Sequence, residues 1–216
     1  MNGQFDWVYR VSQPEGSGPL PVFLMLHGWT GDENSMWVFT PRLPSHGLFI
    51  APRGLYPAPQ GGYAWVSAHN SWPRLEHFEP AVNALFQLLT AARFPAADFS
   101  NLHLIGFSQG AALAYALTLS HPEQVASLSA LSGFLPEGFL LETTSRRLAG
   151  LPVFITHGIK DGLVPVERAR QAASFLEQQG AKVTYCEHDV GHKLSAGCFR
   201  SLATFFKCLA GNLYVS

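Results

Sequence analysis

The stretch Leu104-Ile105-Gly106-Phe107-Ser108-Gln109-Gly110-Ala111-Ala112 determines how the rest of this chain is organised. Apolar residues lead into Gly106 and strong helix formers follow Gly110, so we expect a strand to reverse sharply into a helix at Ser108. Glycines two residues on either side let the strand and the helix pass closely. In this context G-x-S-x-G predicts that Ser108 is a nucleophile, not an ordinary serine in a tight turn. The backbone N–H of Gln109, at the start of the helix, is then placed to stabilise an oxyanion.

Apolar runs of strand length alternate with segments of helical spacing from residue 20 to the end. This alternation predicts an α/β fold with a mainly parallel central sheet and helices on both faces. Sheets of this kind place functional residues at the carboxyl ends of their strands. Strands are expected at residues 5–12, 22–26, 48–52, 102–107, 125–131, 152–156 and 182–186. Helices are expected at residues 34–38, 79–92, 110–120, 166–179 and 194–209, with a small flap or helix within 134–150.

The composition is that of a globular protein, and we expect a single domain over residues 1–216. Hydrophobic residues make up 47% and charged residues 13%, which predicts a large apolar core. A formal net charge of −1 gives no electrostatic basis for binding nucleic acid or an anionic membrane surface. No apolar run reaches the roughly 20 residues of a membrane span. Residues 1–5 lack the features of a secretory signal, so we expect a cytoplasmic protein.

The cysteines and the short motifs exclude several kinds of site. Cys186, Cys198 and Cys208 are odd in number and show no C-x-x-C spacing. We therefore expect neither a disulfide framework nor a zinc site, and we expect a reducing compartment. The sequence contains no phosphate-binding, dinucleotide-binding or histidine-rich metal motif, so it predicts no cofactor and no metal.

A serine hydroxyl needs a base that removes its proton during attack. Among the nine histidines we favour His192, because it follows the last expected strand and the preceding Gly191 leaves room for an imidazole to reach the serine. His27 and His157 each precede a glycine at a strand end, and we expect them to shape loops.

The imidazole in turn needs a carboxylate that orients it and stabilises its cation. Asp161 follows the strand that precedes His192, which gives the order Ser108, Asp161, His192 associated with α/β-hydrolases. Asp189 lies only three residues before the histidine, and Asp98 precedes the strand of the serine, so both are weaker candidates.

Two further segments are expected to complete the site. The loop His27-Gly28-Trp29 follows a strand and can direct the N–H of Trp29 at the oxyanion, with Gly28 or Thr30 as alternatives. Residues 53–75 are rich in proline, glycine and aromatic residues, and a loop of this length is usually functional. The alternative is a surface excursion that covers one edge of the sheet.

The motifs together resemble the phospholipase/carboxylesterase family of small α/β-hydrolases, a group that includes acyl-protein thioesterases. The resemblance covers residues 22–208 and implies an α/β-hydrolase fold and cofactor-free serine hydrolysis of carboxylic esters or thioesters. By match of motif it also implies Ser108, Asp161 and His192 as a catalytic triad, with Trp29 and Gln109 as oxyanion donors. The sequence departs from the pattern at Ala111 and in the loop after Arg53. The matching segments are Leu26-His27-Gly28-Trp29-Thr30-Gly31-Asp32, Pro52-Arg53-Gly54, Gly62-Tyr63-Ala64-Trp65, Gly106-Phe107-Ser108-Gln109-Gly110, Ser132-Gly133, His157-Gly158-Ile159-Lys160-Asp161, Val164-Pro165 and Gly191-His192.

We therefore expect a serine carboxylesterase that acts on a small-molecule ester or thioester through an acyl-Ser108 intermediate, with Trp65 and Leu163 in the wall of an apolar pocket. One alternative is a thioesterase or lysophospholipase with a preference for long acyl chains, which requires a groove formed by residues 53–75 and 134–150. Another is a binding protein that keeps the triad only to hold a ligand. The sequence leaves the substrate and the oligomeric state open.

Overall fold

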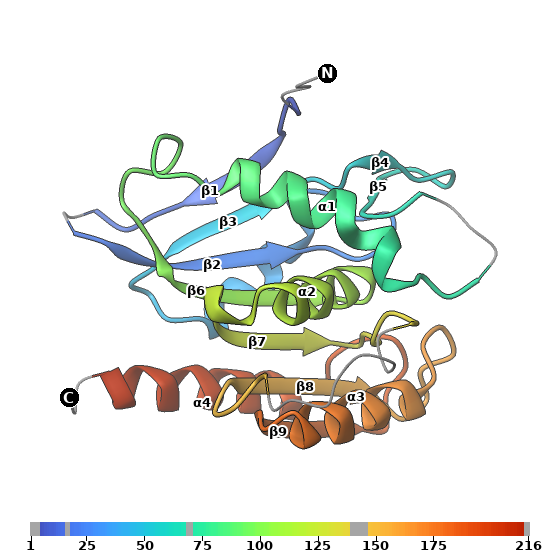
Figure 1. The fold of residues 1–216 in the computed structure, drawn as a ribbon. Coiled ribbons are helices and arrows are strands. Elements are labelled where there is room, and N and C mark those ends of the chain that lie inside the picture. The colour runs from blue at the N-terminus through green and yellow to red at the C-terminus, as the bar shows by residue number, and fades with distance from the viewer. Residues whose placement is uncertain (1–4, 16–17, 68–70, 139–146, 214–216) are drawn as a thin grey trace.

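The structure is a computed structural model, and it describes residues 5–15, 18–67, 71–138 and 147–213. Its central sheet has seven strands, which are β1 (Tyr9–Ser12), β2 (Leu20–Leu26), β3 (Leu48–Pro52), β6 (Ala97–Phe107), β7 (Val125–Leu131), β8 (Pro152–Gly158) and β9 (Lys182–His188). Their order across the sheet is β1-β3-β2-β6-β7-β8-β9 (Figure 1). β1 is antiparallel to β3 and the other pairings are parallel. The prediction of a mainly parallel sheet is confirmed.

The register of the strands brings their carboxyl ends to one edge of the sheet. The paired positions there are Leu26 with Gly106, Phe107 with Leu131, Leu131 with Thr156, and Gly158 with His188. The loops that follow β2, β6, β8 and β9 therefore meet at this edge, where parallel sheets carry their sites.

Helices cover both faces of the sheet, as predicted from the sequence. They are the 3-10 helices η1 (Ser35–Arg42) and η2 (Pro122–Gln124) and the α-helices α1 (Leu75–Leu88), α2 (Gln109–Ser120), α3 (Val166–Gln178) and α4 (Ala196–Leu213). α1, α2 and α3 pack on one face, and Figure 1 shows α2 lying over the middle of the sheet. η1 and α4 pack on the other face. Among the described residues, no helix is long and apolar enough to span a bilayer.

Successive side chains of β2 point into two different apolar cores, because neighbouring residues of a strand face opposite sides of the sheet. Leu24 and Leu26 belong to the core beneath α1, α2 and α3. Phe23 and Met25 belong to the core beneath η1 and α4, where Phe23 packs edge-on against Phe206. Both faces of the strand are thus covered, which explains its continuous apolar sequence.

Helix α1 begins earlier than the sequence predicted. Glu79-Pro80 was expected to open it, but the helix starts at Leu75 and contains Pro80. The start is stabilised by His77, whose ring nitrogen Nδ1 accepts the backbone N–H of Arg74 at 3.0 Å. A histidine in this position is not a standard sequence signal for a helix start, so the proline was the more visible marker.

The segment 53–67 forms a small hairpin of β4 (Tyr56–Pro57) and β5 (Tyr63–Ala64). The N–H of Tyr63 donates to the carbonyl of Gly31 at 2.9 Å. Arg53 donates two hydrogen bonds to the carboxylate of Glu33, at 2.8 and 2.9 Å. These contacts attach the segment to the loop after β2, at the carboxyl edge of the sheet.

Parts of two sequence predictions fall outside the described residues. Residues 68–70 belong to the predicted loop at 53–75, and residues 139–146 belong to the predicted flap at 134–150. The described residues on either side of the second gap, 134–138 and 147–150, form turns, irregular backbone and one isolated β-bridge at Glu137, and no helix.

The expectation about the cysteines is wrong for one pair. Cys186 in β9 and Cys198 in α4 form a disulfide, with their Cα atoms 5.9 Å apart. They are twelve positions apart in the sequence, and only the return of α4 along the sheet brings them together. The inference of a reducing compartment from the cysteines therefore loses its basis. Cys208 is free and exposed.

Candidate active site

Ser108 occupies a backbone conformation that L-residues rarely adopt. Its φ is 53° and its ψ is −116°, and its N–H donates to the carbonyl of Leu131 at 2.8 Å. β6 ends at Phe107 and α2 begins at Gln109, so the chain reverses at this one residue. The motif predicts this strained turn, which places the serine at the carboxyl edge of the sheet.

Close backbone approach requires the glycines on both sides of the serine. A Cβ at Gly106 would collide with the carbonyl of Gly110. A Cβ at Gly110 would collide with the carbonyls of Leu26 and His27. Only glycine therefore lets β6, α2 and the end of β2 meet at this point.

Asp161 and His192 form a hydrogen-bonded pair at the ends of β8 and β9. His192 Nδ1 lies 2.6 Å from Asp161 Oδ2. The other carboxylate oxygen, Oδ1, accepts the backbone N–H groups of Leu163 and Val164, each at 2.9 Å. The backbone thus holds one oxygen of the carboxylate while the other faces the imidazole.

The hydrogen bonds also keep Asp161 ionised. Burial alone would raise the pKa of its carboxyl, but hydrogen bonds from the Val164 N–H, from His192 and from the Leu163 N–H outweigh burial and hold this pKa below 3.8. A carboxylate bonded to Nδ1 selects the tautomer of His192 that carries its proton on Nδ1. Nε2 is then free to accept a proton.

The ring of His192 packs against Phe107, the residue that precedes Ser108, with 5.0 Å between ring centroids. The loop of His192 is also attached to the loop that follows β8, because the N–H of Lys160 donates to the carbonyl of Val190 at 3.0 Å. Three segments that are far apart in the sequence therefore converge beside the strained turn.

The loop after β2 lies directly against the nucleophile candidate. A Cβ at Gly28 would lie 3.2 Å from the Cβ of Ser108. A turn closed by the Gly31 N–H and the Gly28 carbonyl, 3.0 Å apart, carries Trp29. Trp29 and Gln109 thus belong to the two segments that flank Ser108, which is the placement that an oxyanion hole made of their N–H groups requires.

Trp65 joins these two segments. Its indole N–H donates to the carbonyl of His27 at 2.8 Å, and its backbone N–H donates to Oε1 of Gln109 at 2.7 Å. Its side chain is fully buried and offers no surface to a substrate. The assignment of Trp65 to a pocket wall is therefore corrected: the residue supports the loops around the site.

Two buried histidines shape loops, as expected. Nε2 of His27 accepts the N–H of Gly54 at 2.8 Å, so Nδ1 carries the proton and donates to the carbonyl of Gly28 at 2.7 Å. Nε2 of His157 donates to the carbonyl of Val164 at 2.8 Å. Burial lowers the pKa of both imidazoles, which keeps them neutral at neutral pH.

The two weaker carboxylate candidates have other partners. Asp189 forms an exposed ion pair with Lys160, at 2.8 Å. Asp98 accepts the backbone N–H of Ser100 at 3.0 Å, near the start of β6 and away from the carboxyl edge. Asp161 is the candidate carboxylate that the structure pairs with His192.

A cavity of about 450 Å³ opens beside the site. Phe107 and Lys193 in its wall are the chain neighbours of Ser108 and His192, and Trp29 also lines it. The other lining residues are Gly28, Thr30, Gly31, Ser35, Met36, Val38, Phe39, Leu194 and Phe199. The sequence did not predict this wall, because the apolar residues of η1 and α4 have the same pattern as residues of the hydrophobic core.

The predicted pocket residue Leu163 lies elsewhere. It is 71% exposed, next to Asp161, and is not among the residues that line the cavity beside Phe107. The alternative of a long groove between 53–75 and 134–150 depends in part on residues outside those described.

Chemically, the arrangement can activate a hydroxyl and stabilise a developing negative charge. It combines a serine on a strained turn, an imidazole oriented by an ionised carboxylate, and two N–H groups at a loop and a helix start. No step of this chemistry needs a metal ion or a cofactor.

Comparison with known proteins indicates the family that the sequence motifs resemble. The model of the phospholipase/carboxylesterase family matches residues 10–210. Acyl-protein thioesterase 1 from Eremothecium gossypii is 26% identical over 205 residues, which covers 86% of each chain. A probable carboxylesterase from Oryza sativa subsp. japonica is 31% identical over 109 residues, covering 50% of this chain and 41% of its own length.

Solved structures agree on the fold. The carboxylesterase from Bacillus cereus superposes with a TM-score of 0.79, covering 96% of this chain and 95% of its own, at 21% identity. It has the α/β-hydrolase fold that the order of Ser108, Asp161 and His192 predicted. At this level of identity the similarity shows the fold and not the substrate.

Proposed function

From the premise that this chain belongs to the phospholipase/carboxylesterase family, and is an ester hydrolase, we propose that it is a serine carboxylesterase with Ser108, Asp161 and His192 as its catalytic triad. The observation that carries the proposal is the 2.6 Å contact between Asp161 and His192, with the imidazole ring packed beside the strained serine turn. The same geometry in a family of ester hydrolases favours acyl transfer over ligand storage.

In the first half of the proposed reaction, Nε2 of His192 removes the proton of Ser108 Oγ as the oxygen attacks the acyl carbonyl carbon. The carbonyl oxygen becomes an oxyanion, which the N–H groups of Trp29 and Gln109 stabilise. Asp161 stabilises the imidazolium. The tetrahedral intermediate then expels the alcohol, which takes the proton from His192, and Ser108 is left acylated.

In the second half, water replaces the alcohol. His192 removes a proton from the water, the hydroxide attacks the acyl carbon, and the same two N–H groups stabilise the second oxyanion. Collapse of this intermediate releases the carboxylic acid and returns the proton to Ser108. Atoms and charge balance without a cofactor.

The cavity beside Phe107 is proposed as the acyl site. Its apolar wall of Met36, Phe39 and Phe199 suits a hydrocarbon chain. A thioesterase or lysophospholipase acting on long acyl chains is the second candidate, supported by this apolar wall and by the similarity to acyl-protein thioesterase 1 from Eremothecium gossypii. Both candidates use the same triad and differ in the acyl chain and the leaving group.

Hydrolysis of p-nitrophenyl esters from acetate to palmitate tests the proposal, with wild type beside Ser108→Ala. A Ser108-dependent optimum at short chains is the result expected of a carboxylesterase with a small acyl site. An optimum at long chains favours the second candidate. Hydrolysis that persists in Ser108→Ala contradicts the proposed nucleophile.

A protein that keeps the triad only to bind a ligand would bind esters without turnover. The intact carboxylate, imidazole, serine turn and oxyanion segments argue against this alternative, because a protein that only binds a ligand does not need these four features together.

That the chain acts as one domain, in the cytoplasm, remains our prediction. Cell fractionation tests the location.

A further inference from the structure

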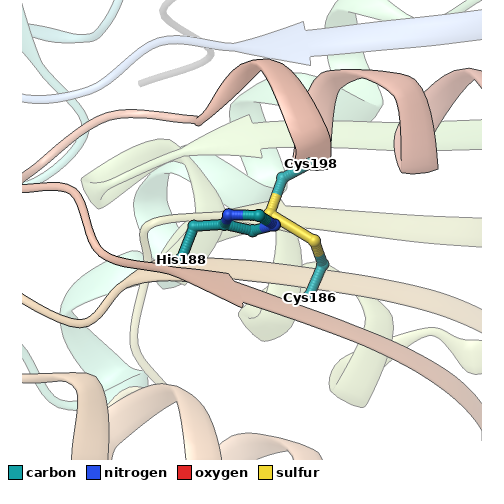
Figure 2. A group of neighbouring side chains, drawn as sticks. All are labelled: Cys186, His188 and Cys198. Carbon is teal, nitrogen blue, oxygen red and sulfur yellow. A yellow bond between two sulfur atoms is a disulfide. The ribbon is translucent and has the colours of Figure 1, made fainter.

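A second cluster of reactive side chains lies between β9 and α4. Cys186, His188 and Cys198 each offer a ligand atom, and these atoms all lie within 4.8 Å of one another. Figure 2 shows the cysteine pair with the imidazole of His188 lying beside it. The chemistry of the proposed triad uses none of the three residues.

The backbone explains how the cluster forms. Cys186 and His188 are two residues apart in β9, so their side chains leave the strand on the same face. Cys198 lies in the first turn of α4, which returns along that face. A Cβ at Gly197 would lie 2.8 Å from Nε2 of His188, so the glycine leaves the space that the ring occupies.

The cluster is accessible from solvent. Cys198 is buried, Cys186 is half-buried and His188 is exposed, so the imidazole forms the outer side of the cluster. A surface cavity of about 540 Å³ is lined by His188 and Gly197 and, farther along α4, by Ser201 and the free Cys208. The imidazole of His188 thus lies between this cavity and the two sulfur atoms.

We propose that Cys186, His188 and Cys198 form a redox-controlled Zn²⁺ site, which is closed as a disulfide when oxidised and binds one Zn²⁺ ion when reduced. Thiolate sulfur and imidazole nitrogen are the ligands that Zn²⁺ prefers, and three protein ligands with a fourth position for water is a known arrangement. At Zn–S distances of about 2.3 Å the two sulfurs of a tetrahedral site lie about 3.8 Å apart. Opening the disulfide allows this separation within the space already occupied by the cluster.

A dithiol reductant supplies two electrons and two protons to the Cys186–Cys198 bond, which becomes two thiols while the reductant becomes a disulfide. Zn²⁺ then replaces the two thiol protons, which pass to solvent, and the neutral His188 imidazole completes the protein ligands. The oxidised pair has no thiolate and does not bind the ion.

The position of the cluster connects it to the proposed active site. His192 lies midway between the two cysteines, six residues from each. A disulfide or a bound ion therefore joins the two ends of the loop that carries the proposed base. This consequence rests on the proposed function, whereas binding of Zn²⁺ does not.

Zn²⁺ binding to the full chain, measured by competition with a chromophoric chelator, tests the site. The protein is reduced with a phosphine, which has no thiol to compete for the ion, or left oxidised. We expect one Zn²⁺ per reduced wild-type chain and none for the oxidised chain. Cys198→Ser should abolish binding, and His188→Ala, at an exposed position, should weaken it at least about tenfold. Cys208→Ser, on the same helix, should bind as wild type does.

Two results would overturn the proposal: reduced wild type that binds no Zn²⁺, or binding that is lost in Cys208→Ser and kept in Cys198→Ser. Ester hydrolysis provides the second readout. With wild-type protein, reduction in the presence of a chelator should lower kcat several-fold, and Zn²⁺ should restore it. If Zn²⁺ binds while no ester is hydrolysed in any state, the metal site stands and the proposed function fails.

Discussion

The backbone N–H of Trp65 donates to the side-chain oxygen of Gln109 at 2.7 Å, inside the protein and beside the serine turn. The indole N–H of the same tryptophan donates a hydrogen bond to the carbonyl of His27. The two segments proposed to supply the oxyanion donors are therefore fixed to each other through one buried residue. Their relative position decides whether both N–H groups reach the same oxygen.

Replacement of Gln109 tests this positioning. Gln109→Ala keeps the backbone N–H but leaves the buried N–H of Trp65 without its acceptor, which costs about 1–3 kcal/mol of stability. We expect kcat for an ester to fall about tenfold with little change in KM, because the oxyanion is stabilised only in the transition state. Gln60→Ala is the control, since it removes only the exposed bond to the indole of Trp29. Equal kcat in both variants would contradict the positioning role.

Replacement of Asp161 by asparagine should lower kcat by about three to four orders of magnitude, because an amide neither stabilises the imidazolium nor selects the same tautomer of His192. The measurement is steady-state hydrolysis of a p-nitrophenyl ester. Asp189→Asn is the matched control: its exposed ion pair with Lys160 lies outside the proposed reaction, and its kcat should stay within about twofold of wild type. A large loss in Asp189→Asn with a small loss in Asp161→Asn would reverse the assignment.

The acyl site is tested by changing the wall of the cavity. Phe199→Ala should shift the preferred p-nitrophenyl ester toward longer acyl chains, because it removes an aromatic ring that stacks on Phe39 at 5.4 Å between centroids. Leu163→Ala, at the exposed position that the sequence suggested, should leave the chain-length profile unchanged. A shift in Leu163→Ala and none in Phe199→Ala would place the acyl chain on the other side of the site.

The stability of the fold should decrease in mild acid. Burial lowers the pKa of His103 from 6.5 to about 4, so the unfolded state binds a proton at a higher pH than the folded state does. Its contribution to stability is complete above pH 6.5 and decreases as the pH falls toward 4, by about 3 kcal/mol in total. Urea unfolding at several pH values measures it.

The control separates His103 from other acid-sensitive groups. His103→Gln should flatten the dependence of unfolding free energy on pH between 6.5 and 4, whereas replacement of the exposed His46 by glutamine should not. An unchanged slope in His103→Gln would show that the buried imidazole is not the source.

The alternation of strands and helices along the chain and the three triad candidates could be predicted from the sequence, because each depends on a short local pattern. The motif G-x-S-x-G predicts the turn at Ser108 because a side chain at either glycine would collide with neighbouring backbone atoms. Asp161 and His192 each follow a buried strand, and a parallel sheet brings such positions to one edge. Their catalytic roles stay predictions until activity is measured.

The features that were missed depend on contacts between distant segments. The cavity wall needs η1, Phe107 and α4 to meet, and apolar residues on those elements look like any core residues. The disulfide was missed because three cysteines without C-x-x-C spacing do not indicate a pair, and Cys186 and Cys198 meet only through the return of a helix. The pattern C-x-H at Cys186 and His188 was visible in the sequence but is too short to indicate a site without the third ligand.

The most direct test of the account is covalent labelling of the folded protein with a serine-directed fluorophosphonate, followed by mass spectrometry of its peptides. We predict one phosphonyl group per chain, on Ser108, with labelling that is lost in Ser108→Ala and strongly slowed in His192→Ala, because the imidazole activates the hydroxyl. An unlabelled wild-type protein, or an adduct on another residue, would contradict the assignment of Ser108 as the nucleophile.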